Sequence, residues 1–235
     1  VWGGAPPYDE KERIPDLPIA NVTRPDGDEL RSYADAEERH EVTLETDTTT
    51  DWMACPIVEA RIEAGNADPE NDDFVLLHGH YDSWGVGIAD NATGDAGLLE
   101  LARVFDEHSD ELQRDRRVAW WPGHSTGRYA GSTWYADEFA MDLVEDCGAH
   151  VDMDSPGAKG STEYVDMACW MPEMHGVVSG AIEDATGAPY EENRPRRAGD
   201  YSFNNIGLSG AFTLSSNIPA DVRETMRWET VGGCG

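Results

Sequence analysis

The sequence predicts an α/β fold in which a mixed, mostly parallel sheet is covered by helices on both faces. After residue 50, short β-favouring segments alternate with longer helical segments, which is typical of such sheets. Residues 74–77 (FVLL) are a continuous apolar run, typical of a strand buried on both faces. Residues 93–112 repeat apolar side chains at helical spacing and form the clearest helix.

The same patterns place the remaining elements. The other expected strands are residues 57–62, 118–121, 149–153 and 208–214, and the other expected helices are residues 29–36, 132–144 and 172–185. Residues 42–50 are β-favouring and alternate like the surface of a sheet. Ligands bind open α/β sheets at the carboxyl ends of the strands, so the residues that follow each strand are candidates for a functional site.

The charge of the chain predicts adaptation to high salt. Asp and Glu number 47 against 17 Lys and Arg, giving a formal net charge of −30, and only Lys11 and Lys159 are lysines. Such self-repulsion destabilises a compact fold in dilute buffer, whereas molar salt shortens the screening length to about 3 Å. An ordinary acidic protein would leave the scarcity of lysine unexplained. Nucleic acid and anionic membranes are poor partners for this surface.

The ends of the chain leave its compartment open. No apolar run is long enough for a membrane span, and no signal peptide precedes the fold. The chain starts at Val1 and stops at Gly235, and we expect both ends to be cut, so it is either cytoplasmic or secreted in a high-salt organism. The four cysteines have no metal-site spacing, and the oligomeric state is open.

Polar clusters directly follow three of the predicted strands. Imidazoles and carboxylates that converge on one sheet edge are what a divalent metal site requires. The clusters are residues 78–84 (HGHYDSW) with Asp90 and Asn91, residues 122–127 (PGHSTG), and Asp152 with Asp154.

These segments resemble the family 28 metallopeptidases, which are co-catalytic zinc exopeptidases. The resemblance runs from about residue 51 to residue 235 and rests on LLHGHYDSWGVGIADNATGDAGLLELARVF, AGSTWYADEF, HVDMD and GDYSFNNIGLSG, in this order. It implies the zinc exopeptidase (phosphorylase/hydrolase-like) fold for residues 51–235, without the C-terminal part of that domain. Residues 1–50 resemble the end of a protease-associated domain with its linker.

The resemblance implies two zinc ions and a role for each matching residue. His80 would bind one zinc, and Asp82 would orient His80 through a hydrogen bond to its far nitrogen. Asp90 would bridge the two ions, and Asp152 would bind the second ion, with Asp154 as the competing candidate. The metals would activate a water molecule that hydrolyses a terminal peptide or amide bond.

Two departures from the family pattern leave the chemistry open. The family has Glu-Glu after the second strand, as general base and zinc ligand, whereas this chain has His124 and Ser125. His124 is a zinc ligand, a base or a structural residue, and if it is a ligand then Asp154 is only a weak candidate for the base. The family's last zinc-binding histidine is expected beyond Gly235, because His175 falls on a predicted helix.

The substrate class follows from the resemblance only in outline. Arg196 and Arg197 are candidates for binding a substrate carboxylate through forked hydrogen bonds, unless they belong to a solvated turn. Asp200, in the segment GDYSFNNIGLSG that resembles the family's pocket region, is a third candidate for contacting the substrate. We expect a metal-dependent exopeptidase of aminopeptidase or carboxypeptidase type. The alternatives are a catalytically impaired relative that serves as a binding module, and a non-peptidase amidohydrolase on the same fold.

Overall fold

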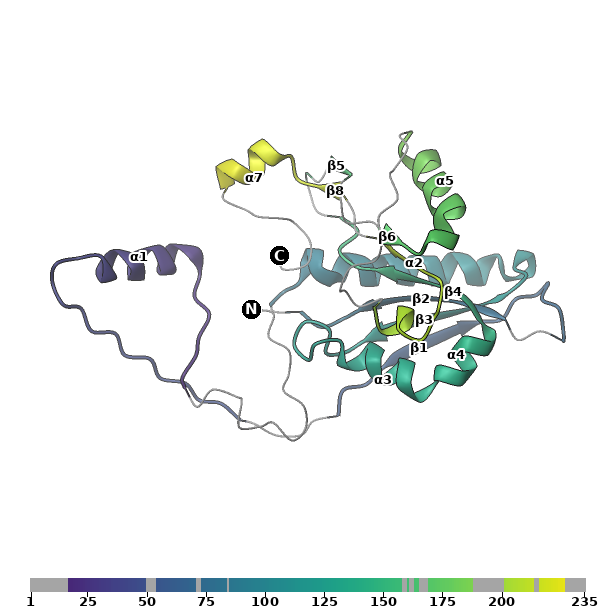
Figure 1. The fold of residues 1–235 in the computed structure, drawn as a ribbon, viewed down its shortest axis with the longest axis horizontal. Coiled ribbons are helices and arrows are strands. Elements are labelled where there is room, and N and C mark those ends of the chain that lie inside the picture. The colour runs from purple at the N-terminus through teal and green to yellow at the C-terminus, as the bar shows by residue number, and fades with distance from the viewer. Residues whose placement is uncertain are drawn as a thin grey trace. The chain divides into compact units, whose positions relative to one another are not determined.

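The computed structural model (Figure 1) separates the chain into two compact units, each described by itself. The smaller unit is residues 5–54, and residues 55–235 belong to the larger. The predicted boundary at residue 50 lies close to this division, and the protease-associated identity of the first unit stays a prediction. The structure describes residues 17–49, 54–70, 73–83, 85–157, 160, 163–164, 169–187, 201–213 and 216–226.

The smaller unit has one helix in its described part, α1 (Arg24–Ala34). The helix begins where Thr23 Oγ1 accepts a hydrogen bond from the Asp26 main-chain nitrogen, with Pro25 in the first turn. These start signals explain why the helix begins before residue 29, its predicted start. Residues 39–49 form no strand, so the predicted β character of the described part of 42–50 is wrong. Local β preference is not enough without a partner strand.

The larger unit is built around a six-stranded sheet in the order β1-β3-β2-β4-β7-β6. Strand β2 pairs in parallel with β3 and β4, and β4 pairs in parallel with β7. The two edge strands, β1 and β6, are antiparallel to their neighbours. The prediction of a mixed, mostly parallel sheet is therefore confirmed. The strands are β1 (Val58–Ile62), β2 (Phe74–His80), β3 (Asp115–Trp121), β4 (Cys147–Met153), β6 (Cys169–Trp170) and β7 (Gly210–Thr213).

Helices cover both faces of this sheet, as predicted, and Figure 1 shows α2 and α5 on one side with α3 and α4 on the other. A separate two-stranded ladder pairs β5 with β8. The remaining elements are η2 (Ile88–Ala92), α2 (Thr93–Glu107), η3 (Ser109–Glu111), α3 (Ala130–Glu138), α4 (Ala140–Asp146), β5 (Glu163–Tyr164), η4 (Pro172–Met174), α5 (His175–Thr186), α6 (Tyr201–Asn204), β8 (Ser216–Asn217) and α7 (Ala220–Met226).

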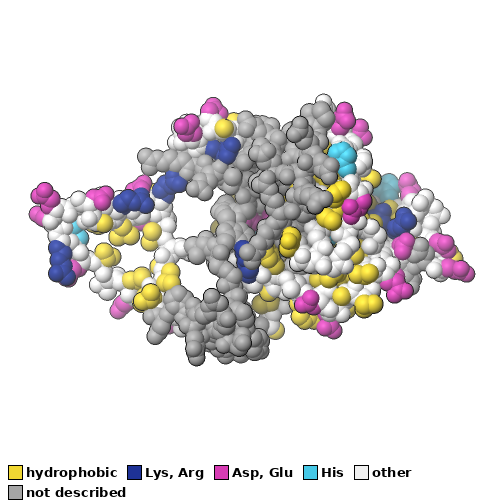
Figure 2. Space-filling model, in the orientation of Figure 1, with side chains coloured by type: hydrophobic (Ala, Val, Ile, Leu, Met, Phe, Trp, Pro, Cys, Tyr) yellow, Lys and Arg dark blue, Asp and Glu magenta, His cyan; other side chains and the backbone are white. Residues whose placement is uncertain are grey.

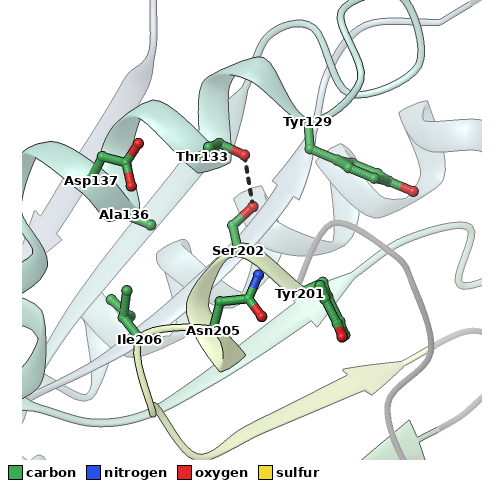
Figure 3. Close-up of a pocket in the computed structure, with 8 residues that line it drawn as sticks. All are labelled: Tyr129, Thr133, Ala136, Asp137, Tyr201, Ser202, Asn205 and Ile206. Carbon is green, nitrogen blue, oxygen red and sulfur yellow. Dashed lines mark hydrogen bonds between the residues drawn. The ribbon is translucent and has the colours of Figure 1, made fainter. Parts of the chain in front are cut away.

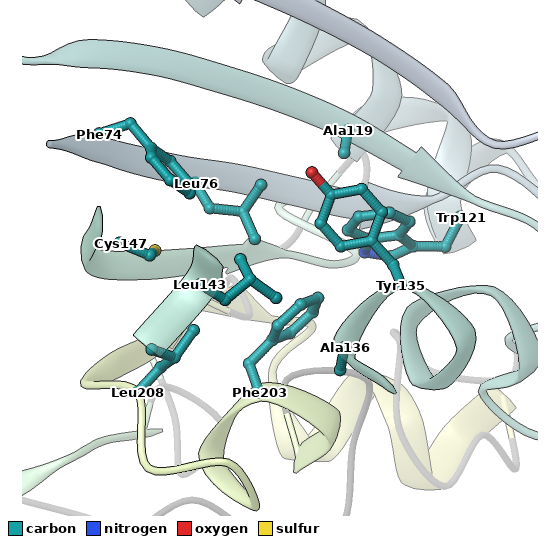
Figure 4. Close-up of a cluster of buried hydrophobic side chains, with 10 residues drawn as sticks. All are labelled: Phe74, Leu76, Ala119, Trp121, Tyr135, Ala136, Leu143, Cys147, Phe203 and Leu208. Atoms are coloured by element: carbon teal, nitrogen blue, oxygen red, sulfur yellow. The ribbon is translucent and has the colours of Figure 1, made fainter. Parts of the chain in front are cut away.

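Alternation along the central strand β2 divides the core into two layers. Phe74 and Leu76 face the layer drawn in Figure 4, where they pack with Leu143 of α4 and Phe203 of α6. The intervening Leu77 belongs to the opposite layer, which also contains Leu98 of α2 and Val118 of β3. Because both faces of β2 are buried, its first four residues are continuously apolar rather than alternating.

The predicted helix at residues 132–144 is two helices in the structure. Phe139 lies between α3 and α4 with φ −108° and ψ 19°, outside the helical region. The break places the Phe139 ring against Tyr135, with ring centroids 4.8 Å apart. Apolar periodicity continues across the break, so the sequence pattern could not reveal it.

On the face drawn in Figure 2, the Asp and Glu side chains of the described residues are scattered rather than gathered in one patch. Within the described residues, no helix is both long enough and apolar enough to cross a membrane.

Candidate metal centre

The centre is built on His80, the last residue of β2. Its ring is 2% exposed, and Nδ1 lies 2.8 Å from the main-chain oxygen of Asp82. A carbonyl oxygen only accepts, so this contact requires the proton on Nδ1. In the neutral imidazole, Nε2 then presents its lone pair to the interior of the site.

Two carboxylates converge on that nitrogen. His80 Nε2 lies 2.9 Å from Asp90 Oδ1 and 3.5 Å from Asp154 Oδ1. His80 Nε2 and Asp90 Oδ1 are buried, yet neither has a hydrogen-bond partner of acceptable geometry. Ligands at 2.0–2.1 Å from a tetrahedral zinc lie about 3.4 Å apart, so these separations are those of atoms aimed at one cation. The residues therefore fit a metal ion.

His124 completes the cluster from the loop that follows β3. Its ring is 6% exposed and stacks on the His80 ring, with centroids 3.9 Å apart and an interplanar angle of 6°. Ligand atoms of His80, His124 and Asp154 all lie within 4.8 Å of one another. Two imidazoles with carboxylate oxygens are a donor set that suits zinc.

The two stacked imidazoles have opposite pKa shifts. Burial lowers the pKa of His80, but Asp154 and Asp90 outweigh it and raise the pKa to about 11. Burial, with the charge of His80, lowers the pKa of His124 to about 3. Without metal, His80 Nε2 therefore holds a proton among the carboxylates, while His124 stays neutral. A metal cation can replace that proton.

The carboxylate of Asp82 holds the His124 loop rather than the ring of His80. Oδ1 accepts a hydrogen bond from the His124 main-chain nitrogen at 2.8 Å. Oδ2 accepts from the main-chain nitrogens of Ser125 and Thr126, each at 3.1 Å, and from Thr126 Oγ1 at 2.9 Å. The carboxylate is 3.8 Å from His80 Nδ1, which bonds the Asp82 main chain instead. The expectation that the Asp82 carboxylate orients His80 is corrected accordingly.

Asn91 sets the spacing between two strand ends. Its Nδ2 donates to the His80 main-chain oxygen at 3.1 Å and to the Met153 main-chain oxygen at 3.0 Å. Its Oδ1 accepts from the Ser155 main-chain nitrogen at 2.9 Å. The Asp90–Asn91 peptide bond is cis. This one amide thereby ties the end of β2 to the segment that contains Asp154.

The other predicted site residues fall in different places. Asp152 is 3% exposed, and its Oδ1 lies 3.4 Å from His78 Nδ1, while Asp154, the competing candidate, lies in the cluster around His80. The role of Asp152 as a ligand stays a prediction. Arg196, Arg197 and Asp200 lie outside the described residues. His175 begins α5 and contacts Trp170, as its expected place on a helix implied.

Sequence reasoning missed one carboxylate beside this centre. Asp95, in the first turn of α2, has a buried Oδ1 without a hydrogen-bond partner. Burial raises its pKa to about 6; the charge of His80 lowers it in part, and the charges of Asp154 and Asp82 raise it further. Its only sequence signal was an acidic residue at a helix start, which interaction with the helix dipole already explains.

It also missed a buried pair of histidines behind the site. His78 and His150 are both fully buried, and their rings stack with centroids 5.3 Å apart. Burial lowers the pKa of His150 to about 4 and the pKa of His78 well below its ordinary value. The signal was a histidine directly after the predicted strand 74–77 and another within the predicted strand 149–153.

A pocket of about 420 Å³ lies next to the cluster. Tyr129 connects the two, because its ring meets the His124 ring edge-on at 4.8 Å and also lines the pocket. Figure 3 shows Ser202 of α6 facing Thr133 of α3, with their hydroxyl oxygens 3.2 Å apart. The lining residues are Tyr129, Thr133, Ala136, Asp137, Tyr201, Ser202, Asn205 and Ile206.

A sequence model of peptidase family M28 matches residues 58–225, which span the sheet and every residue of the cluster. The chain belongs to peptidase family M28. The resemblance predicted from the sequence is therefore confirmed.

Two relatives are similar to this chain over different lengths. Leucine aminopeptidase 2 of Trichophyton equinum is 24% identical over 228 residues, covering 84% of this chain and 41% of that protein. Transferrin receptor protein 1 of Gallus gallus is 34% identical over 90 residues, covering 37% of this chain and 12% of that protein. The chain thus spans about two fifths of the length of the aminopeptidase, and less of the receptor.

Solved structures of two aminopeptidases confirm the fold. An aminopeptidase from Aneurinibacillus sp. strain AM-1 superposes with a TM-score of 0.56 at 21% identity, covering 70% of this chain and 40% of that chain. A zinc aminopeptidase from Bacillus subtilis gives a TM-score of 0.55 at 18% identity, covering 67% of this chain and 39% of that chain. At these identities the likeness concerns the fold alone.

Proposed function

We propose that this M28 chain is the catalytic part of a metal-dependent exopeptidase that hydrolyses a terminal peptide or amide bond. One observation supports the proposal above all others. His80 Nε2 and Asp90 Oδ1 are buried 2.9 Å apart without a hydrogen bond, at the carboxyl edge of the sheet, with Asp154 and His124 beside them. Such a cluster is costly to bury unless a cation is bound there.

The residues of the cluster have different proposed roles in a zinc site. His80, His124, Asp90 and Asp154 would hold the metal, and Asp90, with two oxygens, is the proposed bridge to a second ion at Asp152. Zinc supplies a Lewis acid that lowers the pKa of a water molecule from about 15.7 to about 7 and polarises a carbonyl oxygen.

A pKa of about 3 makes His124 a weak proton acceptor at neutral pH, which favours its role as a ligand over its role as a base.

The pocket beside Tyr129 is the proposed binding place of the substrate. Among the described residues, tyrosine, hydroxyl and amide groups line it, and Asp137 is the one charged residue in that set. A carboxylate on the substrate would meet no cation among these lining residues. The proposed substrates are therefore peptides or amides with neutral or cationic groups in this position.

The test is hydrolysis of a panel of aminoacyl amides and short peptides, in molar salt, before and after chelation. We expect activity that is lost to the chelator and restored by zinc. Loss of a residue that hydrogen-bonds a metal ligand typically reduces metal affinity by about 10- to 100-fold. His124→Ala removes a proposed ligand itself and should reduce zinc affinity by more than that. His108→Ala is the matched control, because His108 is exposed and contacts Glu111 at the end of α2. Equal zinc affinity in both variants would contradict the proposal.

A binding module on the same fold is the second candidate. Residues 122–127 contain no glutamate, so the family's usual base is missing from that loop. The similarity over 90 residues to a protein named transferrin receptor protein 1 also favours a binding module. Zinc-loaded, folded protein that cleaves no substrate in the panel would make this candidate the better one.

Adaptation to high salt is a separate proposal, supported by the net charge of −30. Stability against urea should rise between 0.1 and about 2 M KCl, as the screening length falls from about 10 Å to a few ångströms. Stability that falls or stays flat over this range would reject it.

A further inference from the structure

Behind the metal centre, three buried side chains and the half-buried Asn204 form a continuous chain of hydrogen bonds. Trp121 Nε1 lies 3.0 Å from His78 Nδ1, and His78 Nε2 lies 3.1 Å from His150 Nδ1. His150 Nε2 lies 3.0 Å from Asn204 Oδ1. The chain begins on β3, crosses β2 and β4, and ends on α6.

The indole at one end decides the direction of every proton in this chain. An indole N–H can only donate, so His78 Nδ1 is an acceptor and the His78 proton is on Nε2. His150 Nδ1 must then accept from His78, which puts the His150 proton on Nε2, facing Asn204 Oδ1. When both imidazoles are neutral, each of the three contacts has one donor and one acceptor. The reverse direction would leave two N–H groups facing each other at Trp121.

This direction also fixes how His78 meets Asp152. Asp152 Oδ1 lies 3.4 Å from the same His78 Nδ1 that accepts from Trp121. His78 therefore faces Asp152 with a lone pair and donates no proton to it. The close approach of the two groups is not an ion pair.

The neighbouring strand leaves space for the His150 ring. A Cβ atom added to Gly210 of β7 would lie 2.0 Å from His150 Nε2 and 2.4 Å from His150 Cε1. Contacts under 3.0 Å do not occur in folded proteins without a shift of one partner, so a side chain at this position would displace the ring. The glycine therefore accommodates the chain of hydrogen bonds between β4 and α6.

Asn204 lies on the inner side of the element that forms one wall of the pocket. Tyr201 and Ser202 of α6, with Asn205 and Ile206 after it, line the pocket. Phe203 is fully buried and packs on His78 at 4.7 Å and on His150 at 5.3 Å between ring centroids. Phe203 and Asn204 thus attach α6 to the sheet, the first through ring contacts and the second through a hydrogen bond.

We propose that Trp121, His78, His150 and Asn204 form a directional hydrogen-bond relay that positions α6 and so sets the shape of the pocket. Asn204 is the positioning residue at its end. The link to substrate binding rests on the proposed function, whereas the relay and its direction do not.

The direction is tested by ¹⁵N NMR of the histidine side chains in the zinc-loaded wild-type chain. We expect His78 and His150 each to carry one proton, on Nε2, between pH 6 and pH 8. The Asn204→Leu variant should keep this tautomer, because Trp121 still fixes the direction. The Trp121→Phe variant should lose the preference, because the Asn204 amide can present either its oxygen or its NH₂ group to His150. A proton on Nδ1 of either histidine in the wild type would overturn the relay.

Positioning is tested by the Asn204→Leu variant in two independent ways. Backbone amide shifts of Tyr201 and Ser202 should move, which needs no substrate. With a cleaved substrate, KM should rise roughly tenfold while kcat changes less than about twofold, because a displaced pocket wall weakens binding without touching the metal.

The matched control is Asn66→Leu, because Asn66 is an exposed asparagine in the turn before β2. This variant should change neither the amide shifts of Tyr201 and Ser202 nor the KM. A less stable Asn204→Leu protein with unmoved shifts and unchanged KM would overturn positioning. If no substrate is cleaved by the wild type, the proposed function fails, and the tautomers and amide shifts still decide the relay.

Discussion

Replacing Asp82 by asparagine separates two roles that a carboxylate at this position can have. Its two oxygens accept four hydrogen bonds from residues 124–126, at 2.8 to 3.1 Å. In Asp82→Asn, the remaining oxygen can keep at most the three bonds made by Oδ2, and the new NH₂ group faces the His124 N–H. A hydrogen bond to a charged acceptor contributes about 1.5–3 kcal/mol and a neutral one about 0.5–1.5 kcal/mol. The expected loss is about 2–4 kcal/mol of unfolding free energy.

The measurement is urea unfolding followed by tryptophan fluorescence, in parallel with zinc titration. Asp106→Asn, an exposed change on α2, is the control and should shift stability by less than about 0.5 kcal/mol. Zinc affinity should fall in Asp82→Asn, because the loop that contains His124 is no longer held. The His80 tautomer should not change, since its partner is the main-chain oxygen of Asp82.

Acid should remove the difference between the two proteins. Burial raises the pKa of Asp82, but the main-chain N–H groups of His124 and Thr126 and the Thr126 hydroxyl lower it below 3.8 overall. The wild-type advantage is therefore fully present above about pH 4 and disappears as the pH falls through the lowered pKa. An advantage that persists undiminished at pH 2, or a stability equal to wild type at pH 7, would refute the reasoning.

Three further changes have defined outcomes. Gly210→Ala should lower unfolding free energy by about 1–3 kcal/mol through a clash with His150, measured by urea unfolding. Zinc binding to metal-free protein at pH 8 should release about one proton from His80, whose pKa is about 11, measured by calorimetry in buffers of different ionisation enthalpy. Leu98→Ala should cost about 2–5 kcal/mol because Leu98 is fully buried, whereas the 61%-exposed Leu99→Ala should cost less than about 1 kcal/mol in the same unfolding assay.

The sheet and its central ligand could be predicted because they depend on local patterns. Residues 74–77 are apolar on both faces, and His80 follows them within the same strand, so the position of that imidazole was accessible from the sequence. The double role of Asp82 was not accessible, because spacing alone does not distinguish a main-chain oxygen from a carboxylate. Only the folded loop shows which atom meets the imidazole.

Asp152 and Asp154 show a second limit. Side chains alternate along a strand, so residues two apart point to the same face, and periodicity cannot separate them. Their distance along β4 separates them: Asp152 is still paired with His78 of β2, whereas Asp154 lies past the last residue of the strand. The relay could not be predicted for a similar reason. The register between β2 and β4 brings His78 and His150 together, and neither strand's sequence determines that register by itself.

The Asp82 contacts with residues 124–126 have a consequence for how such a site changes over evolutionary time. Three of the four hydrogen bonds come from main-chain nitrogens, which every residue except proline provides. The loop is therefore held in the same place whatever side chains it presents. A change of side chain in this loop, such as between glutamate and histidine, therefore leaves these three main-chain hydrogen bonds available.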